Sequence, residues 1–328
     1  RHHDLKVFFF DRHRGAEIFT RAVQGAYVGF DGDEKNVSLN PFDCRNTPNN
    51  RAFLRRWLKA ITMVDDALSE KEIGRAVTTA FDYLKPEERI LKNLYKSCFS
   101  PTGNMRRELF RWINPDQYGN IFNAENDSLD LASKRFMAFD FTHIFEDETL
   151  APAVISYIMH RIMAETGDTG VPSLIMIDET APMLKHPMFR DYFIIGLQEG
   201  RKKRQAYLCA FQQPNIIDKL GVGEVIRGQC QTVIFFRNPQ AMPEDYANWN
   251  LTQREIDFIF GKSYRDFPYA ILLSRPATGE SVILDVDLSG LGPYLKLYNS
   301  GRKNVLLVEE LIKEYGEANF VTKYLNIG

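Results

Sequence analysis

The chain has 328 residues, enough for one large α/β domain or two smaller ones at roughly 150 residues per domain. Its hydrophobic fraction of 44% and charged fraction of 26% are those of an ordinary globular protein. The formal net charge of −2 gives no global sign of binding to nucleic acid or to an anionic membrane. No apolar run approaches the ~20 residues of a membrane-spanning helix, so any membrane association is expected to be peripheral.

The cysteines indicate neither a disulfide framework nor a zinc site. Four cysteines occur, and no two of them form a Cys-x-x-Cys pair. Cys209 and Cys230 lie in apolar runs, where a buried thiol acts as a small hydrophobic side chain. This usage is typical of a reducing compartment, so we expect a cytoplasmic location.

The first elements form a β-α-β pattern, which is typical of a parallel sheet. Strands are predicted over Leu5–Phe10 and Ala26–Phe30, with a short helix over Ala16–Val23 between them and a turn at Asp31–Asp33 after them. Asp11 directly follows the first strand. Its carboxylate could face a nucleotide or cap the following helix, and capping is the more common role.

The chain begins almost directly on this first strand. Only four residues precede Leu5, although a domain rarely starts on a central strand of its sheet. We therefore expect a further segment on the N-terminal side of Arg1.

Residues 46–127 differ in character from their surroundings, because charged residues are dense and β-branched runs are few. Helical spacing covers three stretches: Arg51–Ala67, Glu70–Leu84 and Pro86–Cys98. We predict an all-helical insertion over 46–127 that divides an α/β core formed by residues 1–45 and 128–328.

Caps and loops are also predicted within this insertion. Ser69 and Glu72 have the spacing of a capping box at the start of a helix. Ser97–Asn104 and Ile113–Asn126 are rich in Ser, Pro, Gly and Asn, which favours loops.

The strand pattern resumes after the insertion and alternates with helices. The predicted strands are Phe136–Phe141, Ser173–Ile177, Ala206–Phe211, Gln231–Phe236 and a hairpin of Tyr269–Ser274 with Ser281–Asp285. The predicted helices are Thr149–Gly167, Pro187–Arg204, Thr252–Phe260 and Val305–Tyr315. This alternation indicates an α/β fold with a mainly parallel sheet.

The strand Ser173–Ile177 carries the main chemical signal. It is apolar and is followed by two adjacent carboxylates, Asp178 and Glu179. Ligands of open α/β sheets bind at the carboxyl ends of the strands. An apolar strand followed by Asp-Glu is the Walker B pattern of P-loop ATPases, in which the Asp holds Mg²⁺, usually through water, and the Glu polarises the attacking water. A strand that ends at a solvated acidic turn can have the same pattern. The Asp-Glu pair alone therefore does not distinguish a Walker B site from such a turn.

Two further polar residues have the spacing of such a site. Gln212 follows the next strand, where motors with a RecA-type core have a polar sensor of the γ-phosphate. Arg201 ends the helix between the two strands, and an arginine there can reach the nucleotide of a neighbouring subunit as an arginine finger. A solvated helix C-terminus explains the basic run 201–204 as a whole. A functional role is favoured for Arg201, because Gln212 follows eleven residues later.

No phosphate-binding loop is recognisable in the sequence. Gly261-Lys262-Ser263 has the end of that motif, but Ile256 stands where its first glycine is required. The tripeptide also follows a helix instead of joining a strand to one. We therefore expect the loop in a segment upstream of Leu5.

Several linked motifs resemble the C-terminal ATPase domain of the CagE/TrbE/VirB family, the large ATPase of type IV secretion systems. They are Phe8–Ile18, Leu39–Phe42, Leu174–Glu179, Leu197–Lys202, Phe211–Pro214 and Leu251–Glu255. The resemblance covers nearly the whole chain, including the helical insertion. The departure is the missing Walker A segment, which concerns catalysis by this chain alone rather than the family.

The resemblance implies a RecA-like P-loop ATPase core that uses ATP and Mg²⁺ to drive assembly of the secretion apparatus or substrate transfer. It implies homo-oligomers, often hexamers, located peripherally at the cytoplasmic face of the inner membrane with other secretion ATPases and inner-membrane components. By position, Asp178 is the metal-binding Walker B residue and Glu179 its catalytic neighbour. Gln212 is the sensor and Arg201 the finger.

Two other functions stay open on the sequence. A DNA-translocating motor of the FtsK, HerA and coupling-protein class belongs to the same superfamily, although the near-neutral charge argues mildly against direct DNA binding. A non-catalytic scaffold with a decayed nucleotide site is the other. Such a scaffold has no physical need for Asp178, Glu179, Gln212 and Arg201 together.

Overall fold

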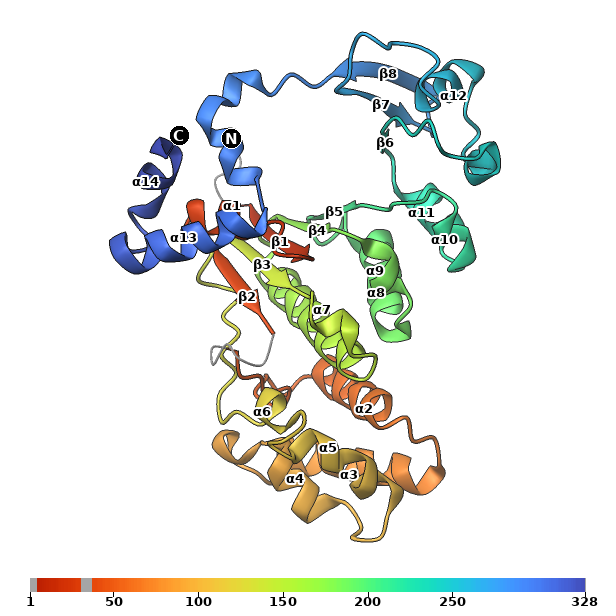
Figure 1. Cartoon of the computed structure of the whole chain (residues 1–328). Helices are drawn as coiled ribbons and strands as arrows, with labels where there is room; N and C mark the ends of the chain where they lie inside the picture. Colours follow the sequence, from red (N-terminus) through yellow and green to blue (C-terminus); the bar gives the residue numbers. More distant parts are fainter. Residues whose placement is uncertain (1–4, 31–36, 328) are drawn as a thin grey trace.

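Two β-sheets and the helices around them make up the chain in a computed structural model (Figure 1). The structure describes residues 5–30 and 37–327, except for the side chains of residues 168 and 169, so the turn predicted at Asp31–Asp33 lies outside the described residues. The larger sheet is parallel throughout, in the order β2-β3-β1-β4-β5. Its strands are β1 (Lys6–Asp11), β2 (Ala26–Gly29), β3 (Phe136–Asp140), β4 (Ser173–Ile177) and β5 (Gln205–Cys209). The predicted α/β class is confirmed.

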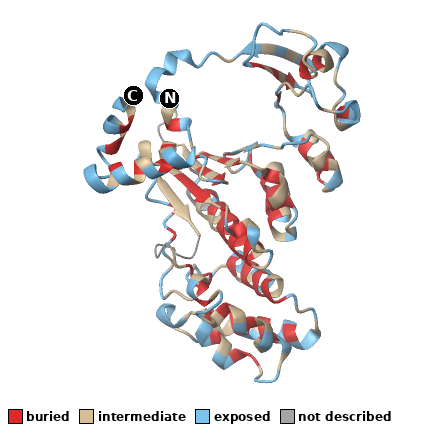
Figure 2. Cartoon of the chain, in the orientation of Figure 1, coloured by how far each residue is buried: buried red, intermediate tan, exposed pale blue. Residues whose placement is uncertain are grey.

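One face of this sheet packs on the main hydrophobic core. Phe8 and Phe10 of β1 are fully buried there, together with Ile175 and Ile177 of β4. The helices α7 (Leu150–Thr169) and α9 (Pro187–Glu199) belong to the same core. Figure 2 shows that buried residues are concentrated along α7 and the adjoining strands. The long apolar helix α7 therefore packs against this face of the sheet and provides much of the core.

The other face of the sheet is covered near its N-terminal half by α1 (Glu17–Ala22). Phe136 of β3 pairs in register with Val7, so its side chain lies opposite to that of Phe8. Phe19 of α1 packs edge-on against Phe136, with ring centroids 5.4 Å apart. Ile18 of the same helix joins a second, smaller core with α13 (Arg302–Tyr315) and α14 (Phe320–Asn326).

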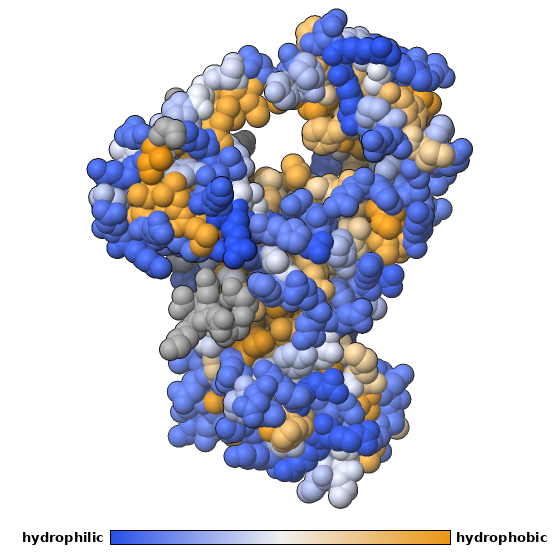
Figure 3. Space-filling model, in the orientation of Figure 1, coloured by the Kyte–Doolittle hydropathy of each residue, from blue (hydrophilic) through white to orange (hydrophobic). Residues whose placement is uncertain are grey.

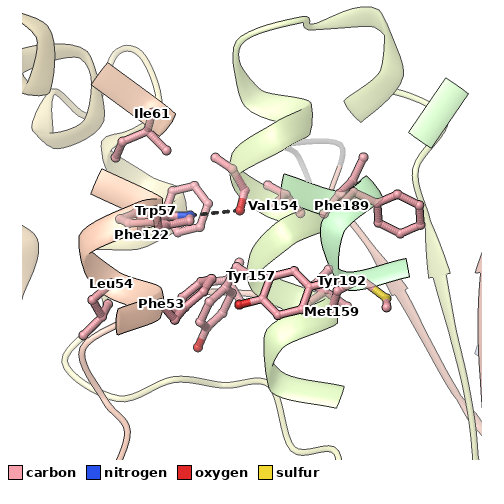
Figure 4. Close-up of a cluster of buried hydrophobic side chains, with 14 of the residues drawn as sticks. Phe53, Leu54, Trp57, Ile61, Phe122, Val154, Tyr157, Met159, Phe189 and Tyr192 are labelled. Atoms are coloured by element: carbon pink, nitrogen blue, oxygen red, sulfur yellow. Dashed lines mark hydrogen bonds between the residues drawn. The ribbon is translucent and has the colours of Figure 1, made fainter. Parts of the chain in front are cut away.

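The segment between β2 and β3 is helical and is continuous with the main core. Its helices are α2 (Pro48–Thr62), α3 (Ala67–Asp82), α4 (Leu91–Cys98), α5 (Asn104–Ile113) and α6 (Gly119–Phe122). Trp57 of α2 is fully buried, and its indole nitrogen donates to the carbonyl oxygen of Ala153 in α7 at 3.1 Å (Figure 4). Phe53 lies one turn away and packs near Tyr157 of α7. The joint between α2 and α7 therefore ties the helical segment to the sheet.

Two local predictions for this segment are wrong. Helix α3 is capped by Asp66, whose side chain accepts from the amides of Leu68 and Ser69, so the proposed capping box at Ser69 does not form. The helix therefore begins one turn earlier than predicted, and its first free amides are those that Asp66 satisfies. The loop expected over 97–104 is present between α4 and α5, at residues 99–103. The loop expected over 113–126 is interrupted by α6, because apolar side chains there are buried against α2.

A separate antiparallel sheet follows, with the order β6-β7-β8. Its strands are β6 (Val233–Phe235), β7 (Ala270–Arg275) and β8 (Glu280–Asp285). The predicted hairpin and the capped helix α12 (Gln253–Ile259) are present, and Thr252 and Glu255 form the capping box of that helix. The strand predicted at 231–236 therefore pairs with β7 and not with the parallel sheet.

The remaining helices are short. They are η1 (Pro86–Glu88), η2 (Ile144–Glu146), α8 (Thr180–Leu184), α10 (Ile216–Lys219), α11 (Gly223–Gln229), η3 (Pro243–Trp249) and η4 (Ser289–Tyr298). None of the helices in the described ranges combines the length and the apolar character needed to cross a membrane.

Candidate functional site

The strands β1, β4 and β5 end at one edge of the parallel sheet, so the residues after them lie close together. Backbone pairing continues past the strand ends. The amide of Asp178 donates to the carbonyl of Phe10 at 3.0 Å, and the amide of Ala210 donates to the carbonyl of Ile177 at 3.0 Å. The carboxyl ends of three neighbouring strands are therefore aligned, which is the position where open α/β sheets bind ligands.

Glu179 lies at the centre of this edge, and both its carboxylate oxygens accept from neighbouring strand ends. Gln212 Nε2 donates to Oε1 at 3.0 Å, and Arg12 Nη1 forms an ion pair with Oε2. The backbone of Glu179 is left-handed, with φ 51° and ψ 58°, at the N-terminus of α8. Such a conformation is uncommon for a residue other than glycine and is found often at functional sites. Two residues predicted to act together, Glu179 and Gln212, therefore make direct contact.

Asp178 is half-buried beside Glu179, and its surroundings disfavour the charged form. Burial raises the pKa of Asp178 above its ordinary value, the Glu179 carboxylate raises that pKa further, and His13 acts in the opposite direction. A divalent cation would offset both the burial and the like charge. Within the described ranges, no cluster of three or more His, Cys, Asp or Glu side chains could hold a metal ion. A single half-buried carboxylate fits Mg²⁺, which keeps several waters and binds through one or two carboxylates and nucleotide phosphates.

Asp11 is the predicted site residue that the structure removes from the open edge. It is fully buried, and its carboxylate accepts from the amides of Arg12 and Ala16 and from the hydroxyl of Tyr27, each at 2.9 Å. Burial is the main cause that raises the pKa of Asp11 to about 6. With its oxygens already engaged, Asp11 holds the turn before α1. The expectation that it faces a nucleotide does not fit these contacts, and Asp11 bonds none of the free amides within α1, whose N-cap is Ala16.

The turn that Asp11 holds places three basic residues at the site. His13 and Arg14 both have positive φ, 63° and 59°, which is unusual for two consecutive residues with side chains. The amide of His13 donates to Thr142 Oγ1 at 2.7 Å. Arg14 is paired with Glu17 at 2.5 Å and with Glu309 of α13. The turn is thus anchored on both sides, and Arg12 is the basic residue directed at Glu179.

Arg201 lies at the opposite end of the strands. Helix α9 leads away from the Glu179 edge, and the turn after it is closed by the amide of Gln205, which donates to the carbonyl of Gly200 at 2.8 Å. Gln205 pairs in register with Ser173, the first residue of β4. A five-residue strand spans roughly 16 Å, so Arg201 cannot reach Glu179 of the same chain. Arg201 is exposed to solvent.

The Gly261-Lys262-Ser263 tripeptide has the role expected from the sequence. Gly261 has a left-handed φ of 70° directly after α12, and the amide of Lys262 donates to the carbonyl of Asp257 at 2.8 Å. This is a helix C-terminus. The tripeptide is no phosphate-binding loop.

Sequence reasoning did not single out Arg12 or His13. Both follow a strand end, as Glu179 and Gln212 do, and this position could have identified them. Arg12 and His13 lie near Asp178 and Glu179 only because β1 pairs with β4. The two strands are 160 or more residues apart in the sequence, so their pairing is set by the tertiary structure.

Comparison with known proteins gives one consistent result. No family model matches the chain. The chain is 29% identical over 321 residues to the type IV secretion system protein VirB4 of Bartonella henselae, an alignment that covers 96% of the chain and 40% of that protein. It is 24% identical over 331 residues to the conjugal transfer protein TrbE of Rhizobium radiobacter, covering 97% of the chain and 39% of that protein. The chain thus spans about two fifths of the length of these relatives.

A solved structure supports the fold. VirB4 of Thermoanaerobacter pseudethanolicus superposes with a TM-score of 0.66 at 12% identity, over 86% of the chain and 81% of that structure. The parallel sheet and its helices thus form an α/β core with a RecA-like fold. Along nearly its whole length the chain is similar to the VirB4 and TrbE proteins of type IV secretion, so the predicted resemblance to the CagE/TrbE/VirB family is confirmed.

Proposed function

We propose that this chain is the hydrolytic core of a type IV secretion motor that uses ATP and Mg²⁺ to drive apparatus assembly or substrate transfer. The observation that carries the proposal is the contact of Glu179 with Gln212 at the carboxyl ends of adjacent parallel strands, next to Asp178. If Asp178 and Glu179 formed only a solvated acidic turn, nothing would require Gln212, which follows the neighbouring strand, to contact the Glu179 carboxylate.

Each residue has a distinct role in this proposal. Asp178 holds Mg²⁺ through water, which neutralises charge on the nucleotide phosphates. Glu179 orients and polarises the attacking water, and Gln212 reports the presence of the γ-phosphate. Arg201 acts on the nucleotide of a neighbouring subunit, and its exposed position at the amino end of β5 supports a role between subunits over one within the chain.

The phosphate-binding loop belongs, in this proposal, to a segment outside the chain. Strand β5 is at the edge of the parallel sheet, and Leu208 on it is 48% exposed. In β6, at the edge of the small sheet, Ile234 is 46% exposed. Figure 3 shows an opening between the two sheets that is bordered by hydrophobic side chains. Apolar strands with free edges are normally covered, and a strand leading into the phosphate-binding loop would cover β5.

The wider assignments follow the relatives. We propose a homo-oligomer, with a hexamer as the expected form, located peripherally at the cytoplasmic face of the inner membrane. Its partners would be other type IV secretion ATPases and inner-membrane components. An oligomer is also what a role for Arg201 between subunits requires.

The test compares two neighbouring carboxylates in the full-length protein. Asp178→Asn removes charge beside Mg²⁺ and should weaken Mg²⁺-dependent ATP binding as well as hydrolysis. Glu179→Gln keeps size and most hydrogen bonding, so ATP should still bind while turnover falls by about 10²-fold or more. ATP affinity and turnover are measured for both variants.

The matched control is Glu87→Gln, because Glu87 is an exposed glutamate on η1, in the helical segment between β2 and β3. It should leave both quantities unchanged. Mild and equal effects of the Asp178 and Glu179 substitutions would mean that this strand end is a solvated turn and would refute the proposed function.

A further inference from the structure

We propose that Arg12 is a positioning residue that exchanges partners: it binds the Glu179 carboxylate when the site is empty and moves to the terminal phosphate of ATP when the site is filled. The proposal rests on the proposed function. It adds a device that makes the base available only when a phosphate is present.

The contacts of Glu179 describe its closed state. One carboxylate oxygen accepts from Gln212 Nε2 at 3.0 Å, and the other is paired with Arg12 Nη1. The carboxylate is therefore bound at both ends by protein donors. Donors bound to a carboxylate stabilise its charged form and make it a weaker base, so the loss of the Arg12 ion pair would make Glu179 a better base for the attacking water.

Arg12 is the partner that can be exchanged. Its side chain is 30% exposed, and its guanidinium lies over the ring of Phe145 at 5.5 Å. Its Nε is buried and has no hydrogen-bond partner among the described residues. A guanidinium has five donors in a planar fork that matches phosphate oxygens. Arg12 thus keeps unused donors while it is bound to Glu179, so a phosphate can offer it more bonds than the carboxylate does.

The backbone at Arg12 is held by hydrogen bonds on both sides of the residue. Its amide donates to Asp11 Oδ1 at 2.9 Å, and the next residue, His13, is held by Thr142. Arg12 also follows β1, which pairs directly with β4. A rotamer change at Arg12 can therefore transfer the guanidinium away from Glu179 without moving the strands, and Glu179 is released to face the water.

The exchange predicts a specific coupling in ATP binding. If Glu179 and the phosphate compete for Arg12, then Glu179→Gln weakens the resting partner and should tighten binding of a non-hydrolysable ATP analogue. The gain should depend on Arg12. Glu179→Gln should lower the Kd of the analogue by a factor about tenfold larger when Arg12 is present than in an Arg12→Ala background. This difference lies within the range of coupling free energies measured between residues in direct contact. ADP, which lacks the terminal phosphate, should show no such coupling.

The experiment is a double-mutant cycle on the full-length protein with Arg12→Ala, Glu179→Gln and the double variant, measured by calorimetry with the ATP analogue and with ADP. Arg12→Lys keeps the charge but not the fork, so it should restore part of the coupling. Arg302→Ala, an exposed arginine at the start of α13, is the off-site control and should give no coupling with Glu179→Gln. Circular dichroism checks that each variant is folded.

The outcomes separate the two proposals. Strictly additive effects of the Arg12 and Glu179 substitutions on analogue binding would overturn the exchange and leave the proposed function standing. Equal coupling with ADP would also overturn it, because the partner would then not be the terminal phosphate. Failure of the unaltered full-length protein to bind the analogue would overturn the proposed function, and the exchange with it.

Discussion

Asp11 and Glu179 are acidic residues on neighbouring strands, yet their surroundings give them different uses. Asp11 is buried and accepts from Arg12, Ala16 and Tyr27. Glu179 is partly open to solvent and contacts groups that can move. At the residue scale, the number of donors already bound and the degree of burial separate a carboxylate that holds a turn from one that can take part in chemistry.

Asp11 should make the stability of the chain depend on pH. Its folded-state pKa of about 6 lies above the ordinary value of 3.8, so the folded state holds this proton more tightly than the unfolded state does. The protonated Asp11 carboxyl group therefore adds to the free energy of unfolding below about pH 4, and this contribution is lost as the pH rises through 6. From pH 5 to pH 7, wild type should lose about 1 kcal/mol of unfolding free energy that Asp11→Asn does not lose.

Urea unfolding of both proteins at the two pH values gives this difference. Asp116→Asn, at an exposed position, should show the same pH dependence as wild type. An unchanged pH dependence in Asp11→Asn would show that the hydrogen bonds to the Asp11 carboxylate outweigh its burial.

Helix α9 connects the two ends of the parallel strands, where Glu179 and Arg201 lie. It runs from the Glu179 edge back to the start of β5 and packs on that strand at Gly196. A Cβ atom at Gly196 would lie 2.0 Å from the hydroxyl oxygen of Tyr207, whose own hydroxyl has no hydrogen-bond partner among the described residues. The absence of a side chain at Gly196 therefore lets α9 approach β5 closely, and the approach aligns the strand that ends near Gln212.

Gly196→Ala should destabilise the chain by about 1–3 kcal/mol, because the added methyl group overpacks this contact. Adding Tyr207→Phe should recover part of the loss, since it removes the nearest atom. Gly74→Ala is the matched control in α3, where a Cβ atom meets nothing within 4 Å. It should stabilise the chain by up to about 1 kcal/mol. Thermal unfolding of the four proteins measures these effects, and equal behaviour of Gly196→Ala and Gly74→Ala would contradict the close packing.

At the scale of the whole molecule, the proposed nucleotide site lies at the carboxyl ends of the parallel strands, and the basic turn 201–204 lies at their amino ends. The Glu179 edge has Asp178, Glu179 and Gln212, for which we propose the roles of metal-binding carboxylate, base and sensor, whereas no phosphate-binding loop occurs among the described residues. Arg201 lies at the amino end of β5, far from the Glu179 of its own chain. Both facts point to partners for these surfaces: a further segment for the first and a neighbouring subunit for the second.

Residues 1–328 by themselves should bind ATP only feebly. The loop amides and the lysine of a P-loop supply most of the phosphate contacts in such sites. Calorimetry of this chain against the full-length protein measures the difference. Micromolar affinity for the isolated chain would require a phosphate site elsewhere in it.

Arg201→Ala in the full-length protein should leave nucleotide binding nearly intact and lower turnover by roughly 10³-fold, the usual effect of losing an arginine finger. Mixed with Asp178→Ala protein, it should recover part of the activity, because a mixed interface can combine one intact finger with one intact metal site. Turnover is measured across mixing ratios in a verified oligomer. No recovery at any ratio would exclude a role between subunits.

The sequence by itself determined the elements whose signals are local. The strand Ser173–Ile177 with its Asp-Glu end, the capped helix after Thr252 and the β7–β8 hairpin were all predictable, because apolar periodicity, capping side chains and turn residues act within a few positions. Asp66 replaced Ser69 as the cap of α3 because two competing local caps lie three residues apart, and only packing of the helix selects one. Tertiary structure alone decided that Arg12 meets Glu179, that Asp11 is buried and that Arg201 lies at the far end of the sheet. These outcomes depend on which strands are neighbours, and the pairing of β1 with β4 is set by burial of apolar faces from distant parts of the chain.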